Sequence, residues 1–178
     1  MALPDYKTIE AGTPIIWGDA EAAGVTHTLT FTALADTKAR MGAVADLGAA
    51  WEQEQSVQLI VETGTAPVAG ECAYVYFGSA DAATRYPGGL TGSDGAYNDG
   101  SEAEWLAQLG LPVCILIATA DANTEQRANP VIWTPPARYV IPVFWNELGQ
   151  AIRDTDPDTA NLSRIILVPR RSKIQDAA

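Results

Sequence analysis

The sequence predicts an all-β protein, built as an antiparallel β-sandwich or jelly roll with one short helix near residues 101–109. Three observations lead to this fold class: short stretches of strand-type composition recur along the chain, turn-forming residues separate them, and helical periodicity is nearly absent. The length of 178 residues is typical of one domain. We expect a sandwich domain over 25–168, preceded by an N-terminal arm with a first short strand over 1–24 and followed by a basic C-terminal tail over 169–178.

The strand candidates follow one another along the chain. Residues 25–34 (VTHTLTFTAL) place apolar side chains at alternate positions between threonines, which is typical of a half-buried strand. Residues 56–63 and 71–79 repeat this pattern, and in the second of them both faces carry apolar or aromatic side chains. The almost wholly apolar segment 111–119 predicts a central strand covered on both faces. Further strands are expected over 13–17, 42–47, 131–133, 139–145 and 163–168.

A proline restricts one of the late strands. Pro142 lies inside the apolar segment 139–145, and proline has no N–H group to donate to a neighbouring strand. We therefore expect this strand to lie at the edge of a sheet, or to be bulged at the proline.

Residues 81–101 are rich in glycine, aspartate and asparagine, which favour turns. We expect one long exposed excursion here, and long loops of this kind are often functional. Tyr86 and Tyr97 lie within it, so their rings are candidates for stacking on a partner such as a sugar. The alternative is that the aromatic residues of this chain pack in the core or at an interface.

The stretch 101–109 (SEAEWLAQL) is the clearest helical segment. Ser101 and Glu104 have the spacing of a capping box at its start, and Gly110 ends it. A helix of about two turns needs packing against other elements to be stable.

Charge is distributed unevenly. The formal net charge is -11, an excess of acid that argues against nucleic-acid binding. Residues 1–163 carry 21 acidic and 7 basic side chains, a formal -14, whereas residues 164–178 carry a formal +3. Such a basic end either docks on an acidic neighbour, including another copy of the chain, or is simply a solvated terminus. Its basic residues are Arg164, Arg170, Arg171 and Lys173.

The residue types that most enzymes need are scarce. Nucleophilic triads generally use a histidine as base, and the one histidine, His27, lies inside the strand candidate 25–34. We therefore interpret His27 as a packed strand residue. No nucleotide-binding, esterase or zinc-protease motif occurs, and no apolar run approaches the ~20 residues of a membrane span. We expect no enzymatic activity, no cofactor and no membrane association.

Metal-binding patterns are weak as well. Cys72 and Cys114 lie in separate apolar segments and are interpreted as small buried residues. A disulfide between them is the alternative. Aspartates recur at alternate positions over 154–158, as at the start of a calcium loop, but Thr159 and Ile165 stand where that loop needs glycine and glutamate. A polar turn is therefore preferred. Other oxygen ligands, without a specific spacing, are Asp94, Asn98, Asp99 and Glu102.

Several short motifs between residues 45 and 170 resemble a small structural protein family of tailed bacteriophages. In that family an E-T-G-x-A-P turn joins two sandwich strands, and a P-P-x-R-Y-V segment leads into a late strand that ends in asparagine. The matching segments are LGAAW at 47–51, VQLIVETGTAP at 57–67, GSDGAY at 92–97, PPARYVIPV at 135–143 and NELGQA at 146–151.

The resemblance implies a β-sandwich that is a component of the virion. We expect a capsid decoration, or cement, protein that binds the major capsid protein or other virion proteins and forms a homo-oligomer, such as a trimeric ring. Another virion part, such as a head fibre base, neck or tail component, is the first alternative. The second is a carbohydrate-binding module on the particle surface that uses the 81–101 excursion.

Overall fold

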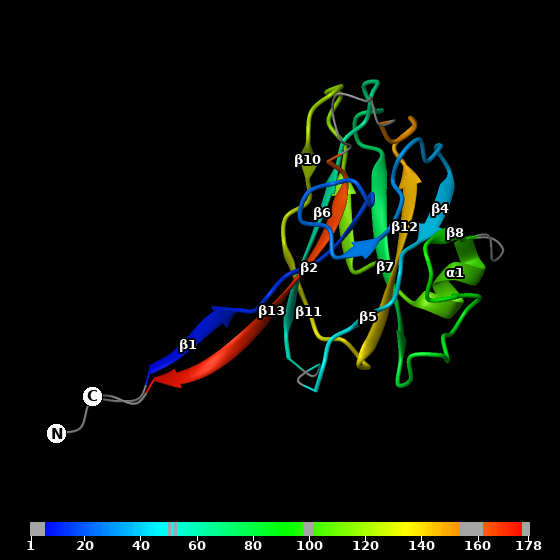
Figure 1. The fold of residues 1–178 in the computed structure, drawn as a ribbon. Coiled ribbons are helices and arrows are strands. Elements are labelled where there is room, and N and C mark those ends of the chain that lie inside the picture. The colour runs from blue at the N-terminus through cyan, green and yellow to red at the C-terminus, as the bar shows by residue number, and fades with distance from the viewer. Residues whose placement is uncertain (1–5, 50, 52, 98–101, 154–161, 176–178) are drawn as a thin grey trace.

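The computed structural model shows two β-sheets packed face to face, with one helix outside them (Figure 1). The predicted all-β sandwich is thereby confirmed. Most strand pairs are antiparallel, and the longest of them join segments that are far apart in the sequence. The structure describes residues 6–49, 51, 53–97, 102–153 and 162–175.

The first sheet is organised around the long strand β13 (Arg164–Gln175). It pairs antiparallel with β6 (Gln55–Val61) on one side and with β2 (Ile15–Gly18) on the other. The remaining strands of this sheet are β3 (His27–Thr28) on β2, β10 (Gln126–Arg127) and β11 (Val131–Trp133) on β6, and β1 (Tyr6–Ala11) on β13.

The second sheet is organised around β7 (Cys72–Ala80) and β12 (Tyr139–Glu147), which pair along all nine of their residues. Both were predicted as strands, and both carry apolar side chains on each face. The other strands are β4 (Lys38–Met41), β5 (Ala45–Asp46) and β8 (Gly95–Tyr97) on one side and β9 (Cys114–Ile117) on the other.

The main core lies between the sheets and follows the predicted alternation. Val57, Leu59 and Val61 of β6 are at most 1% exposed and face alternate residues of β7, including Val75 and Phe77. Burial of apolar surface on this scale is the main source of stability in a domain of this size.

A second apolar cluster covers the outer face of the second sheet. Tyr76 of β7 and Val143 of β12 point into it, and Leu90 and Tyr97 cover them. The helix α1 (Glu102–Leu109) lies beside the same face (Figure 1). The predicted helix is therefore confirmed, whereas its proposed cap Ser101 lies outside the described residues. The described part of the predicted excursion, 81–97, is mostly exposed or half-buried, but Leu90 and Tyr97 are buried against the apolar outer face and 95–97 form a strand.

The predicted strand over 25–34 is mostly wrong. Only β3 pairs as a strand, although Leu29 and Phe31 are fully buried as the alternation requires. The carboxylate of Asp19 accepts the backbone N–H groups of Phe31 and Thr32 at 2.8 and 3.2 Å. These amides therefore bond to a side chain where a strand would use a neighbouring strand.

Pro142 does not lie in an edge strand. It pairs with Phe77 of β7, in the middle of the second sheet. On the opposite side of β12 the partner is interrupted between β4 and β5, and there Gly42 donates its N–H to the carbonyl of Pro142 at 2.9 Å. Since N–H and C=O of one strand residue point to the same side, the missing donor faces this interruption. The irregularity expected at the proline therefore lies in the partner of β12, between β4 and β5.

Both ends of the described chain leave the sandwich together. β1 pairs with residues 170–175 of β13 in six consecutive antiparallel pairs, from Tyr6 with Gln175 to Ala11 with Arg170. We call these two segments, 6–11 and 170–175, the arm. Figure 1 shows the arm projecting from the body of the sandwich. The expected basic tail over 169–178 is thus, through Gln175, the outer half of a strand.

Candidate functional site

The arm extends the first sheet beyond the body of the sandwich (Figure 1). Beyond Arg170, the described residues of β13 pair with β1 and with no other strand. A two-stranded ribbon has two edges of backbone N–H and C=O groups, and such a ribbon is at best marginally stable alone in water. Six residues per strand give it a length of about 20 Å. The arm therefore offers backbone for pairing with another chain.

The arm is also basic. Its two segments carry four basic side chains and one acidic one, a formal +3, while the rest of the chain carries 7 basic and 21 acidic side chains, a formal -14. Lys7 in β1 adds to the predicted basic group, and sequence reasoning missed it because only the pairing of the two ends brings it to β13. The arm and the body thus have opposite charge.

The predicted basic residues divide between body and arm. Arg164 lies in the sandwich, where its guanidinium donates to Glu125 at 3.3 Å. The backbone N–H of Arg170 donates to the carbonyl of Glu54 at 2.8 Å, at the point where the arm leaves the sheet. Arg171 and Lys173 are arm residues, in register with Glu10 and Thr8. Arg164 is therefore a body residue, and the other three mark the arm.

The strand β9 forms an unpaired edge of the second sheet. The segment 111–119 was predicted to be central and covered on both faces, and this is wrong: β9 pairs with β7 on one side only among the described strands. Cys114 and Leu116 are buried, whereas Ile115 and Ile117 are 45% and 68% exposed. The sequence held no sign of this difference, because every position in the strand is apolar.

A hollow of about 430 Å³ runs beside this edge. Its walls come from β9 and from the segment that leads through β10 to β11 in the other sheet. Ile115 and Ile117 line one side of it, and Arg127 and Val131 the other. Ile132, next to Val131, is also 46% exposed. Large apolar side chains gathered at one edge are typical of a contact surface.

The structure places the two tyrosines differently from the prediction. Tyr97 is 2% exposed, and its hydroxyl donates to the carbonyl of Gly88 at 2.9 Å, so its ring is not available for stacking. Tyr86 is half-buried, its ring lies against Gly92, and its hydroxyl donates to the carbonyl of Ala83. Tyr86 borders a shallow hollow of about 600 Å³.

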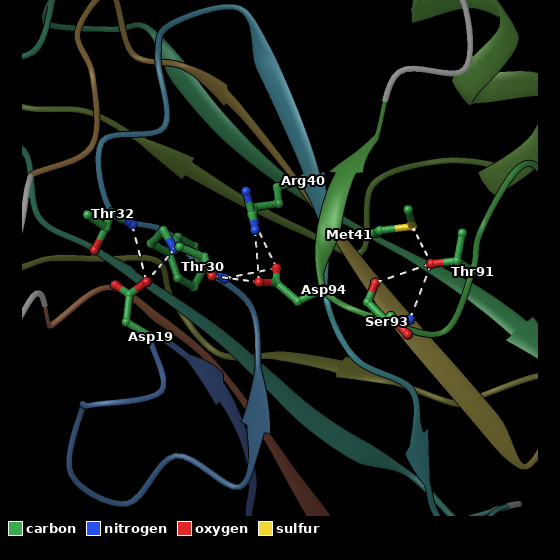
Figure 2. Close-up of polar contacts among 9 residues, drawn as sticks. Asp19, Thr30, Thr32, Arg40, Met41, Thr91, Ser93 and Asp94 are labelled. Atoms are coloured by element: carbon green, nitrogen blue, oxygen red, sulfur yellow. Dashed lines mark hydrogen bonds and ion pairs between the residues drawn. The ribbon is translucent and has the colours of Figure 1, made fainter.

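A polar network fixes the loop between β3 and β4 to the outer layer. The guanidinium of Arg40 donates to both carboxylate oxygens of Asp94, at 2.7 and 2.9 Å, and Thr30 donates its backbone N–H and its hydroxyl to the same carboxylate. Figure 2 shows Asp94 between these two partners, with Asp19 and Thr32 to one side. Both oxygens of Asp94 accept from donors of the fold, so the network is suited to holding the loop in place.

The two aspartates of this region have opposite pKa shifts. Burial raises the pKa of Asp94, but the hydrogen bonds from Arg40 and Thr30 outweigh burial, so its pKa lies below the usual value. For Asp19, burial outweighs the amide hydrogen bonds and its pKa is raised. Its Oδ2 has no hydrogen-bond partner among the described residues.

Other candidate groups are accounted for by packing. Burial lowers the pKa of His27, whose ring lies 5.7 Å from that of Trp17. Cys72 and Cys114 are free thiols in adjacent strands; the prediction that both are small buried residues holds for Cys114, whereas Cys72 is only partly buried. No cluster of three or more metal-ligating side chains occurs among the described residues. The aspartates at 154–158, and Asn98 and Asp99, lie outside those residues.

No helix in the described part of the chain is both long enough and apolar enough to span a membrane. Comparison with protein families, characterised proteins and solved structures finds no match for this chain. The arm and the β9 edge are therefore interpreted from their own geometry, and together they form a candidate assembly surface.

Proposed function

We propose that this protein is a structural subunit of a bacteriophage particle, and that it decorates the head shell by binding the lattice of the major capsid protein. The observation that carries the proposal is the arm, in which both ends of the described chain leave the sandwich as a paired ribbon (Figure 1). A subunit of a repeated lattice gains a connector that reaches beyond its own body.

Two further features support this role. The motifs between residues 45 and 170 resemble those of a virion structural family, and the observed sandwich is the fold that this resemblance implies. Ionisable groups of the described body form structural pairs such as Arg40 with Asp94 and Arg138 with Asp46. These pairs join neighbouring segments of the fold.

Copy number in purified particles tests the proposal. Quantitative mass spectrometry against the major capsid protein should give hundreds of copies per particle for a shell protein. About a dozen copies or fewer would indicate the alternative, a neck, tail or head fibre component. Absence from purified particles would overturn the structural role altogether.

The contribution of the arm to attachment can be measured separately. Particles carrying Arg170→Ala/Arg171→Ala should release the protein at lower salt than wild-type particles, because fewer charges hold it. Arg138→Ala is a matched control, since Arg138 is a basic residue of the body that already pairs with Asp46. Equal release by both variants at every salt concentration would show that the charge of the arm has no part in attachment.

The hollow beside Tyr86 favours a second candidate function, binding of a surface glycan. Arg85 and Asp81 line it with Tyr86, a combination of polar groups and one ring that suits a sugar. Glycan-array binding by the wild-type protein that is lost in Tyr86→Ala, and kept in Arg127→Ala, would support this function. No binding to any glycan would remove it.

A further inference from the structure

We propose that the arm of one copy pairs with the β9 edge of a second copy, so that copies of this chain associate head to tail. This inference rests on the proposed role as an assembly subunit, and it names both surfaces of the contact. The donor is the ribbon of residues 6–11 and 170–175. The acceptor is the edge that carries Ile115 and Ile117, with the hollow beside it.

The backbone of β9 is positioned to accept a strand. Ala118, directly after β9, donates its N–H to the carbonyl of Glu71, so its backbone groups face the side of β7. The backbone groups of successive strand residues point to alternate sides, so the N–H and C=O groups of Ile115 and Ile117 point away from β7. Among the described strands, none lies on that side. Unpaired strand edges of this kind are templates for addition of another strand.

The acceptor edge has a defined end. The side-chain amide of Gln126 accepts from the N–H of Thr119 at 2.8 Å and donates to its carbonyl at 2.9 Å, as a neighbouring strand would. The edge is therefore closed at Thr119 by the protein itself, while the two isoleucine positions before it are left for a partner. An arriving strand would pair over the length of β9, which has four residues, so part of a six-residue arm strand suffices.

The exposed apolar side chains on the β9 edge favour pairing of this edge with another strand. Ile117 is 68% exposed and Ile115 is 45% exposed, and both face the hollow of about 430 Å³ with Val131. Covering apolar side chains of this size contributes about 25 cal/mol per Å² removed from water. A strand placed along β9 would cover both isoleucines and close the hollow.

The arm is the occupant that the molecule itself supplies. It continues the straight course of β13 away from the body, so it projects from its own sandwich and is presented to a neighbour (Figure 1). Its formal +3 meets a body of formal -14, which draws the arm of one copy toward the body of another at low salt. Donor and acceptor are different surfaces, so the contact is heterologous and repeats into a ring or a chain.

Solution mass of the full chain tests this inference without particles. By light scattering after size exclusion at low salt, the wild-type protein should associate in a concentration-dependent way. Ile117→Lys places a charge on the acceptor edge at an exposed position and should weaken association by about tenfold or more. Arg171→Glu/Lys173→Glu should do the same from the donor side. Leu162→Lys is the matched control, because Leu162 is 40% exposed and precedes the opposite end of β13.

Mixing the two defective variants gives the sharper test. The Ile117→Lys protein keeps an intact arm, and the arm variant keeps an intact edge, so together they should form a one-to-one complex that grows no further. Hydrogen exchange should then show new protection of the Ile115 and Ile117 amides in the arm variant.

Three results would overturn the inference: a wild-type monomer at all concentrations, association unchanged by Ile117→Lys, or no complex on mixing. Each of these results would still be compatible with the virion role if the copy number in particles is high. Association in solution together with absence from particles would support the contact between copies and overturn the virion role.

Discussion

Gly42 and Pro142 meet in the middle of the second sheet. The N–H of Gly42 bonds the carbonyl of Pro142 at 2.9 Å, and a Cβ on Gly42 would lie 2.9 Å from Pro142 Cγ and 3.1 Å from Leu29 Cβ. The proline ring thus occupies the interruption between β4 and β5, and only a residue without a side chain fits opposite it.

The first prediction follows from this contact. Gly42→Ala should lower the free energy of unfolding by about 1–3 kcal/mol, because the added methyl overpacks a buried site where Leu29 is fully buried. Urea unfolding followed by tryptophan fluorescence measures the change. Gly64→Ala is the control, since the nearest atom to its Cβ would be 3.8 Å away and Gly64 lies outside the left-handed region. Equal stability of both variants would contradict the packing argument.

The second prediction concerns the carboxylate that joins the β3–β4 loop to the outer layer. Asp94→Asn should destabilise the protein at neutral pH by about 1–3 kcal/mol, because Arg40 and Thr30 lose a charged acceptor. The folded pKa of Asp94 is depressed, so its stabilisation is present above the ordinary value of 3.8 and is lost as pH falls through the folded pKa. The wild-type and variant stabilities should therefore converge in acid. A constant difference at all pH values would refute this assignment.

The third prediction concerns Asp19, whose contribution to stability changes with pH in the opposite direction. The folded pKa of Asp19 is raised, so its contribution to stability is full below the ordinary value of 3.8 and is lost as pH rises through the folded pKa. Asp19→Asn keeps an oxygen that accepts from Phe31 and Thr32, and it should match or exceed wild-type stability at neutral pH.

Asp19→Ala serves as the comparison for this variant. It removes the acceptor of both amides and should cost about 1–3 kcal/mol at any pH. Denaturant unfolding of both variants across the acid range measures the difference. If Asp19→Asn were as unstable as Asp19→Ala, the negative charge of Asp19 would be holding the loop, and its folded pKa would have to lie below the ordinary value.

The fourth prediction concerns the two thiols. Cys114 is 1% exposed and burial raises the pKa of its thiol, whereas Cys72 is partly exposed on the neighbouring strand. A thiol-specific reagent should label Cys72 in the folded protein and reach Cys114 only on unfolding. Mass spectrometry of the labelled peptides identifies the site, and Cys72→Ser should abolish the fast phase. Rapid labelling of Cys114 in that variant would show that β9 opens on its own.

The sequence predicted the sandwich because its strands alternate as a two-sided layer requires. The same reasoning failed at β9, where Ile115 and Leu116 look alike in sequence and differ only by what the rest of the chain leaves uncovered. It failed again over 25–34, since the acceptor for the Phe31 amide comes from Asp19, twelve residues earlier.

The candidate assembly surface could be predicted only in part. The charge contrast was visible in the basic residues at 170–173, but the partner strand β1 was not, because its pairing with β13 joins the two ends of the chain. Tyr97 was expected at the surface because glycine and aspartate surround it. Tyr97 is buried because the outer faces of β7 and β12 are apolar and its ring packs against them.

The continuity of β13 has a mechanical consequence. One strand runs from the arm into the centre of the first sheet, where β6 and β2 flank it on both sides. Tension applied to the arm along its axis would therefore strain the hydrogen bonds of both ladders in shear, so that they resist together. A connector anchored in this way holds against pulling far better than one attached by a peptide tether at the rim.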